Sequence, residues 1–376
     1  MTAAFGYGNR VGADARRNIL PELPTAIPHD IRKEVNWAVF SNPVNPLGSP
    51  QVYVQAMHDA LADGELAYQP DESAYALRRI MAAYYEVPIE SVFVGVSPAQ
   101  CIRAIVQSMG SAKVGLAVPA SIDTELAIVN GGSEPVRLKN PFSFATCKYG
   151  VARRDDTEFD AAILSNPGYP TSRLLSRDVL AEYLDKCDYV IVDESYVELS
   201  LGAESFLPLV TRCPNLFVVR NLSASFAIPG TPVACVFAHP DMISRIVPAA
   251  DPTANGMASE VLASVFPQLV GYMEETSEYL DREIPWLQYM LSLIPGMHVS
   301  PSEGNFILCR FDGSRMDLAV ESAEELSIRL QLAGFLVPQL TRIVGLEGQE
   351  NYFAIAVQKH ENNQKLIRAL RRIITR

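Results

Sequence analysis

One apolar run and the polar turn behind it constrain the fold of this chain more than any other stretch. Leu216–Val219 is apolar and partly β-branched, which is typical of a strand buried on both faces of a parallel sheet. The run stops at Arg220–Asn221 and continues as Leu-Ser-Ala-Ser-Phe-Ala-Ile-Pro-Gly. Ligands bind at the carboxyl ends of the strands in such sheets, so we expect the residues after this strand to belong to a site.

Other parts of the chain repeat this arrangement of an apolar strand that ends in a polar, glycine- or proline-containing turn. The further strands predicted in this way are 92–95, 114–118, 161–164 and 189–192. Helical spacing of apolar residues predicts helices at 51–61, 73–85, 276–293 and 361–374. Closer to the C-terminus we expect a strand pair within 298–311 and single strands at 335–340 and 352–357.

The composition is that of an ordinary globular protein with a large core. The chain has 376 residues, of which 48% are hydrophobic and 20% charged, which leaves room for two domains. Its formal net charge of -12 argues against nucleic acid or an anionic membrane as the main partner, because both bind clustered lysine and arginine.

The sequence also bears on where the protein is located and on the state of its cysteines. No apolar run approaches the roughly 18 residues that a membrane span needs, and the start of the chain lacks a signal-peptide profile. We therefore expect a cytoplasmic protein. The six cysteines are far apart and form no Cys-x-x-Cys pair, which predicts reduced and mostly buried thiols rather than a zinc or redox site.

The segment that follows 216–219 resembles the signature of fold-type I pyridoxal-phosphate (PLP) enzymes, the aspartate aminotransferase superfamily. It is most similar to the histidinol-phosphate aminotransferase and threonine-phosphate decarboxylase branch, where the pattern is Leu-(Ser/Thr)-Lys-x-(Phe/Tyr)-x-(Ile/Leu)-(Pro/Ala)-Gly-Leu-Arg. In that branch the lysine forms a Schiff base with PLP, and the arginine binds the cofactor phosphate. Here Ala224 stands at the lysine position and Pro232 at the arginine position. Ser223 and Ser225 are the main polar groups left in the segment.

Three further motifs carry the resemblance along the chain. Asn45 lies in Asn-Pro-Leu-Gly, a loop that faces the substrate in the family. Asn166 lies in Asn-Pro-Gly-Tyr-Pro-Thr, where the family's asparagine bonds the pyridine 3-oxygen. Asp193 and Tyr196 lie in Asp-Glu-Ser-Tyr, where the aspartate pairs with the pyridine nitrogen and the tyrosine faces the 3-oxygen. The resemblance implies that these four side chains belong to the inherited site, although an acid after a strand is, taken alone, equally typical of a helix cap.

Other cofactor positions depart from the family pattern. Ser97 and Pro98 stand in the strand-to-helix turn that holds the cofactor phosphate in relatives, and Pro98 removes one backbone donor. Ser121 stands where relatives stack an aromatic ring on the pyridine. Serine provides no such ring.

Substrate and interface positions depart as well. Gln69, or Tyr68 with a shift of one residue, aligns with a tyrosine that crosses the family's dimer interface to the neighbouring cofactor phosphate. Gln358 stands at the arginine that binds the substrate carboxylate. Gly6 replaces a histidine that the branch places near its substrate phosphate.

The resemblance runs from about residue 2 to the C-terminus and implies an α/β fold. We expect a large domain over 41–255 with a mostly parallel seven-stranded sheet between helices. Residues 1–40 and 256–376 should form an N-terminal arm and a smaller α+β domain. The resemblance also implies a symmetric homodimer whose two clefts are each lined by both chains.

The departures from the family pattern predict weak or no binding of PLP, so no cofactor is expected. Our first hypothesis is a biosynthetic enzyme that acts on an amino-acid-like small molecule without an internal aldimine, by lyase, cyclase or condensation chemistry. Asp193 and Tyr196 would be its acid and base, and Asn166, Asn45 and Ser223 would orient the ligand.

Two other hypotheses belong to different classes. The chain could be a non-catalytic protein that binds a metabolite or a partner in the inherited cleft. It could also be a PLP-dependent aminotransferase or decarboxylase inactivated by an engineered lysine-to-alanine change at 224. That change would leave Pro232, Gln358 and Ser121 unexplained.

Overall fold

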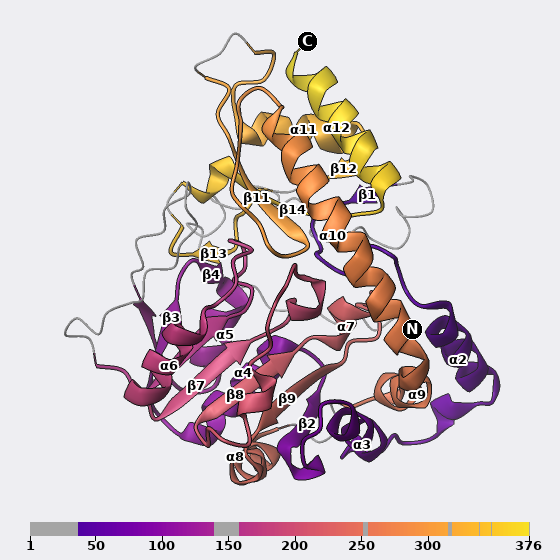
Figure 1. The fold of residues 1–376 in the computed structure, drawn as a ribbon, viewed down its shortest axis with the longest axis vertical. Helices are drawn as coiled ribbons and strands as arrows, with labels where there is room; N and C mark the ends of the chain where they lie inside the picture. The colour runs from indigo at the N-terminus through magenta and orange to yellow at the C-terminus, as the bar shows by residue number, and fades with distance from the viewer. Residues whose placement is uncertain are drawn as a thin grey trace, which may run out of the picture.

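The computed structural model describes residues 37–138, 158–250, 255–314, 318–337, 339–346 and 348–375. The expected N-terminal arm up to residue 36, including Gly6, lies outside the described residues, and so does Cys147. Two units are seen in Figure 1: a large one around a broad sheet, and a smaller one, in orange and yellow, stacked on its upper edge.

The larger unit is built on a seven-stranded sheet with the strand order β2-β9-β8-β7-β6-β3-β5. In that order the strands are Val92–Gly95, Ala234–Ala238, Leu216–Arg220, Tyr189–Asp193, Ala161–Ser165, Lys113–Ala117 and Glu134–Leu138. Neighbouring strands are parallel except at β9, which runs antiparallel to both β2 and β8. The predicted α/β fold with a mostly parallel seven-stranded sheet is confirmed.

Alternate side chains of these strands feed two apolar layers, because successive residues of a strand point to opposite faces. Val218 belongs to the layer covered by helices α2 (Gln51–Ala62), α3 (Tyr75–Tyr84), α6 (Arg177–Lys186) and α9 (Met257–Val265). Val219 belongs to the layer covered by α4 (Pro98–Met109), α5 (Ile122–Asn130) and α8 (Pro240–Ile246). Burial from both sides explains why every residue of β8 and β9 is buried.

The long helix α10 (Val270–Ser292) leads into the smaller unit. Its antiparallel sheet has the order β10-β11-β14, formed by Met297–Val299, Phe306–Phe311 and Tyr352–Ala356. Helices α11 (Ala323–Leu332) and α12 (His360–Ile374) pack with α10 in a second core around these strands. The division of the chain at residue 255 remains our proposal.

Two short strand pairs join distant parts of the chain. The parallel pair consists of β1 (Ala38–Val39) and β12 (Phe335–Leu336), which covers the start of the strand predicted at 335–340. The antiparallel pair consists of β4 (Ala120–Ser121) and β13 (Ile343–Val344). This second pair ties the C-terminal segment to the edge of the larger unit beside the carboxyl ends of its strands.

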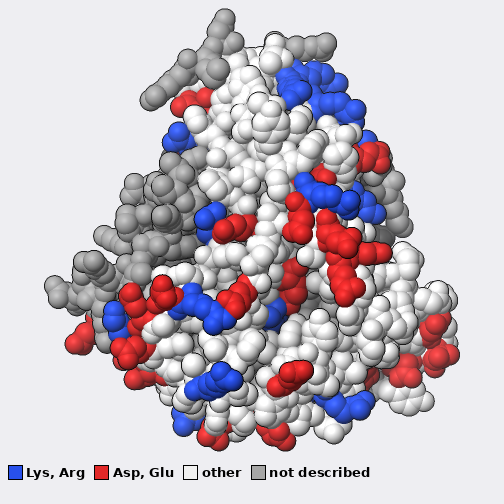
Figure 2. Space-filling view, in the orientation of Figure 1, with Lys and Arg blue, Asp and Glu red and all other residues white. Residues whose placement is uncertain are grey.

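The described surface carries charges of both signs. On the face drawn in Figure 2, blue side chains gather most densely near the top, over α12, whose last turn carries Arg371 and Arg372. Within the described ranges no helix is both long and apolar enough to cross a membrane, and no group of three or more His, Cys, Asp or Glu could hold a metal ion. The described cysteines are free thiols, and all of them except Cys213 are buried.

Candidate functional site

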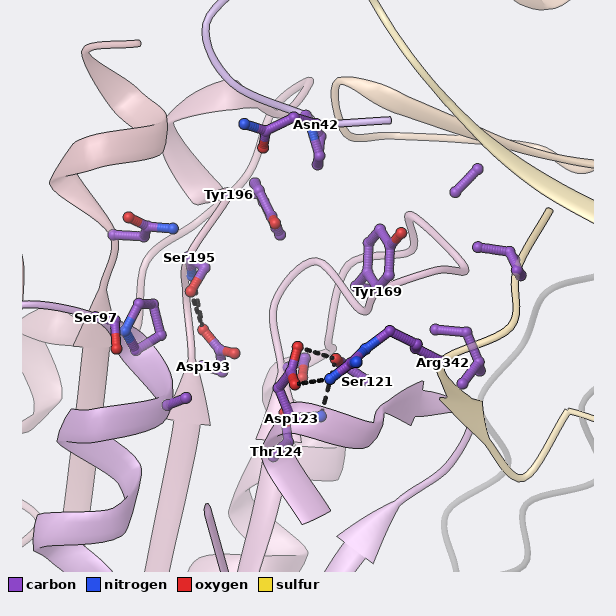
Figure 3. A pocket seen from close by; sticks show the side chains of 18 of the residues that line it. Asn42, Ser97, Ser121, Asp123, Thr124, Tyr169, Asp193, Ser195, Tyr196 and Arg342 are labelled. Atoms are coloured by element: carbon purple, nitrogen blue, oxygen red, sulfur yellow. Dashed lines mark hydrogen bonds and ion pairs between the residues drawn. The ribbon is translucent and has the colours of Figure 1, made fainter. Parts of the chain in front are cut away.

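A cavity of about 690 Å³ opens between the carboxyl edge of the large sheet and the smaller unit. Strands β2, β3, β6, β7 and β8 run in one direction, and at the last position of each, or within four positions after it, a polar residue lies on the cavity wall. These residues are Ser97, Ser121, Ser165, Asp193 and Asn221. The opposite wall comes from residues 41–43, 339–343 and Ala354 (Figure 3). The cavity therefore lies where ligands bind in parallel sheets.

Asp193, the last residue of β7, presents a carboxylate to this cavity. Its Oδ1 accepts hydrogen bonds from the hydroxyl of Ser195 and, at 3.0 Å, from the Ser195 backbone N–H. Its Oδ2 has no hydrogen-bond partner within the described part of the chain. Burial raises the pKa of Asp193, and the two hydrogen bonds from Ser195 oppose that rise. Asp193 therefore offers one oxygen to a ligand and holds a proton more readily than a solvated aspartate.

Tyr169 and Tyr196 line the same cavity. Both rings pack on Phe306 of β11 with centroid separations of 5.2 Å, and the two tyrosine centroids are 6.3 Å apart. Burial raises the pKa of Tyr169 to about 12, with a further contribution from the charge of Asp123. Burial also raises the pKa of Tyr196. Both phenols keep their protons at neutral pH and can donate a hydrogen bond or a proton.

In the turn from β2 into α4, backbone N–H groups donate hydrogen bonds to side chains of the turn itself. Pro98, the first residue of the helix, has no N–H, and the N–H of Gln100 donates to Ser97 Oγ at 3.2 Å. The side-chain oxygen of Gln100 in turn accepts from the Val96 N–H at 3.1 Å. Gly95 makes room for this side chain, because a β-carbon there would lie 2.6 Å from the Gln100 oxygen. Few N–H groups of this turn are left for an anion.

The segment after β8 forms the single-turn helix α7 (Leu222–Ser225). Ala224 is 3% exposed and packs in an apolar cluster with Phe40 and Leu199. It is not among the residues that line the cavity. Asn221 does line the cavity, and its side-chain oxygen accepts from the Ala224 N–H at 3.3 Å. Asn221 is therefore the residue of this segment that a ligand in the cavity would meet.

A buried ion cluster lies next to α7. The guanidinium of Arg220 is 3.2 Å from Glu194, forms an ion pair with Glu198, and donates to the Ser205 hydroxyl at 2.7 Å. Burial raises the pKa of Glu194, and the charge of Arg220 opposes that rise. The hydroxyl of Ser225 donates to Glu198 at 3.2 Å, which links α7 to the cluster.

Two asparagines that sequence analysis assigned to the site are buried and bonded within the protein. Asn45 is 2% exposed and donates to the carbonyl of Ser225 at 2.9 Å and to Thr276 Oγ1 at 2.7 Å. Asn166 is 1% exposed, and its side-chain oxygen accepts from the N–H of Leu175 at 3.0 Å. Neither residue lines the cavity.

Three more of the expected site residues lie away from the cavity lining. The hydroxyl of Ser223 accepts from the N–H of Val233 at 2.6 Å and donates to the carbonyl of the same residue at 3.0 Å. Gln358 follows β14, and its carbonyl accepts from the hydroxyl of Tyr279 at 2.9 Å. Tyr68 is 72% exposed on the surface. The residue of β14 that reaches the cavity is Ala354.

The cavity contains an ion pair that sequence analysis missed. Arg342 donates to Asp123 Oδ1 of α5 at 2.6 Å, and the two side chains are 48% and 57% exposed. The backbone holds the pair in place, because the Ile122 N–H donates to the Arg342 carbonyl at 2.9 Å and Ile343 is opposite Ser121 in the β4–β13 pair. Arg342 is the single lysine or arginine among the described lining residues. The partners are 219 positions apart, so no local pattern signals them.

Known proteins resemble this chain over most of its length. The family model for aminotransferase class I and II matches residues 32–370. A putative threonine-phosphate decarboxylase of Caldanaerobacter subterraneus subsp. tengcongensis is 28% identical over 337 residues, 87% of this chain and 88% of the relative. A histidinol-phosphate aminotransferase of the same organism is 25% identical over 355 residues, 93% of this chain and 94% of the relative.

Solved structures share the fold. The histidinol-phosphate aminotransferase from Clostridium acetobutylicum superposes with a TM-score of 0.76 at 21% identity, covering 89% of this chain and 98% of that one. The L-threonine-O-3-phosphate decarboxylase from Porphyromonas gingivalis superposes with a TM-score of 0.74 at 21% identity, covering 88% and 97%.

Proposed function

This chain belongs to the family of class I and II aminotransferases, and from that premise we propose that it binds an amino-acid-like small molecule and acts on it without a lysine-bound cofactor. The observation that carries the proposal is the contrast between two places. Asp193 and Tyr196 share the cavity, whereas Ala224, at the position where the resemblance puts the lysine, is a buried methyl group. The acid–base groups are kept and the covalent attachment point is not.

The residues around the cavity do not fit tightly bound PLP, the cofactor of this fold type. A Schiff base needs an amine, and Arg342 is the sole lysine or arginine in the described lining. A phosphate dianion needs several aligned donors, but in the α4 turn Pro98 has no N–H, and the N–H groups of Val96 and Gln100 donate within the turn. Asp193 and Tyr196 line the cavity and could face the ring, but neither holds the phosphate or forms a covalent bond. We therefore derive no chemical step through PLP.

Asp193 and Tyr196 supply the pair of groups that general acid–base chemistry needs. The unpartnered oxygen of Asp193 would take a proton from the substrate, and the phenol of Tyr196 would give one to a leaving or newly charged oxygen. The raised pKa of Asp193 brings this carboxyl closer to neutral pH, and the raised pKa of Tyr196 keeps the phenol protonated. A dehydration, a cyclisation or a condensation can proceed in this way, because each removes one proton from the substrate and returns one to it.

A thermal-shift panel tests whether the cavity binds such molecules. The compounds are L-threonine, O-phospho-L-threonine, L-histidinol phosphate and L-aspartate. A ligand present at about 100 times its dissociation constant stabilises the folded state by about 2.7 kcal/mol, which raises Tm measurably. Each stabilising compound is then incubated with the protein, and its conversion is followed by NMR.

Two substitutions test the chemistry. Asp193→Asn and Tyr196→Phe should each lower turnover by roughly 100-fold or more while the ligand still binds. Tyr189→Phe is the control, because the Tyr189 hydroxyl accepts from exposed Arg245 at 3.4 Å and Tyr189 is not among the described residues that line the cavity. Full turnover in both site variants would refute the assigned roles. Ligand binding without turnover in the unaltered protein would favour a non-catalytic metabolite-binding protein.

An absorbance spectrum tests the cofactor proposal. The purified protein should be colourless, with no band between roughly 320 and 430 nm, the range in which bound PLP absorbs. A titration that gave tight binding of PLP or its amine form would overturn this expectation. That result would favour an enzyme that uses PLP without a covalent bond to a lysine.

A further inference from the structure

We propose that Arg342 is the anion anchor of this cavity, and that a carboxylate or phosphate group of the ligand displaces Asp123 from it. The inference rests on the proposed function, because it names the group by which the same cavity holds its amino-acid-like ligand. It also assigns a role to a residue that no motif of the sequence marks.

The charges of the cavity lining carry the first step. Its described residues include two carboxylates, Asp123 and Asp193, and one guanidinium, Arg342. In Figure 3 the Arg342 side chain points toward Asp123 and Ser121, while Asp193 stands apart beside Ser195. An amino acid carries an ammonium and an anionic group. Among the described lining residues, Arg342 is the group that suits the anion.

The state of Arg342 carries the second step. Its main chain is fixed, because its carbonyl accepts from the Ile122 N–H and the N–H of Ile343 donates to Gln349 at 3.2 Å. Its side chain, by contrast, is 48% exposed and is bonded through one nitrogen to Asp123. A half-exposed pair of this kind is weak. The remaining guanidinium donors have no partner within the described residues, so a carboxylate or phosphate could bind them in a bidentate manner.

The neighbourhood of Asp123 carries the third step. Ser121 caps α5, its hydroxyl accepting from the Asp123 N–H at 3.2 Å, and Thr124 and Thr341 also line the cavity. These hydroxyls can donate to an anion held by Arg342. Asp123 repels such an anion and competes with it for the same guanidinium. The two members of the pair should therefore affect binding in opposite directions.

Calorimetric titration of the full-length protein tests the proposal, with O-phospho-L-threonine, L-threonine and L-threoninamide as probes. Arg342→Gln should weaken binding of O-phospho-L-threonine and L-threonine, the two probes with an anionic group, at least about tenfold. A hydrogen bond to a charged group contributes about that much affinity. Asp123→Asn should strengthen binding several-fold. Arg137→Gln is the matched control. Arg137 of β5 pairs at 2.7 Å with Glu125, which lies on the same helix as Asp123. Arg137 does not line the cavity, so binding should not change.

The probes also separate the two anion sources. A loss in Arg342→Gln that affects L-threonine but not L-threoninamide identifies the carboxylate as the anchored group. A loss confined to O-phospho-L-threonine identifies the phosphate. Thermal unfolding of each variant checks that it is folded.

Three outcomes would overturn the anchor: unchanged affinities in Arg342→Gln, weaker binding in Asp123→Asn, or no binding of either anionic probe to the unaltered protein. The proposed function fails separately. Loss of turnover in Asp193→Asn together with normal ligand binding in Arg342→Gln would support the acid–base roles and contradict the role of Arg342 as the anchor.

Discussion

The guanidinium of Arg220 lies 3.2 Å from the carboxylate of Glu194, and the two side chains are 3% and 0% exposed. A second carboxylate, that of Glu198, pairs with the same guanidinium and accepts from the Ser225 hydroxyl. These contacts hold α7 against β8 from inside the protein. The position of the segment that contains Ala224 therefore does not depend on a bond to a cofactor.

Arg220→Met should lower the free energy of unfolding by about 3–5 kcal/mol, because it leaves the buried carboxylate of Glu194 and the half-buried one of Glu198 without their counterion. Urea denaturation measures the change. Arg177→Met is the control, because Arg177 pairs with Glu204 on the surface, where the side chains are 63% and 59% exposed, and its loss should change stability little. An equally small effect at Arg220 would show that water or protonation already neutralises the cluster.

Asp193→Asn should raise the urea midpoint at pH 7. Burial raises the pKa of this carboxyl in the folded state, so the folded state binds a proton more tightly than the unfolded state. The stability that protonated Asp193 contributes is present at low pH and is lost as the pH rises through the raised value. Asparagine keeps an acceptor for Ser195 and carries no charge. The gain should therefore be largest at neutral pH and small near pH 4, and a lower midpoint at pH 7 would contradict this account.

Ala224→Lys alone should not restore the family's covalent chemistry. The new side chain would start inside the apolar cluster of Phe40 and Leu199, and the phosphate donors would still be missing. We expect lower stability and no new absorbance band after PLP is added. Ala224→Met separates the effect of side-chain length from that of the charge. A borohydride-stable PLP adduct at the introduced lysine, detected by mass spectrometry, would show that the cavity retains more of the cofactor site than we infer.

A symmetric homodimer is expected, as the family resemblance implies. Leu66 and Tyr68 are 75% and 72% exposed, next to and within the loop that the resemblance places across the subunit interface. Burial of such side chains against a second copy would remove apolar surface from water. Light scattering at micromolar concentration should give twice the chain mass, and Leu66→Asp should lower it. Leu332→Asp, at a position 85% exposed on α11, should not; a monomeric unaltered protein would refute the prediction.

Much of the sheet was predictable because burial on both faces leaves an uninterrupted apolar run. Strands β7 and β8 extend only one residue past their predicted ends, at Asp193 and Arg220. Strand β5 was not predicted, since this edge strand has exposed polar positions and contains Pro135. Strand β9 is fully buried but begins and ends with alanine, which is depleted in strands, and it was missed as well.

The predicted residues that do line the cavity, Ser97, Ser121, Asp193 and Tyr196, lie at the end of a strand or a few residues after it. Asp193 ends β7 and Ser97 follows β2, and both line the cavity. Asn166 and Ser223 also follow strands, but their side chains turn back to the main chain. Within a strand, the alternation of side chains determines which face of the sheet each one points to. It does not determine where a side chain points in the turn after the strand. Arg342 reaches the cavity through pairing between distant segments, which no local pattern encodes.

The place of β9 in the sheet has a consequence for how the chain is made. Strand β9 is the only described neighbour of β2, yet β3, β5, β6, β7 and β8 all precede it in the chain. A chain leaving the ribosome therefore completes β2 early and supplies its partner late. Until residue 238 has emerged, β2 remains an unpaired apolar strand, and such edges favour association between chains. During synthesis β2 therefore has to be kept from pairing with other chains until β9 can cover it.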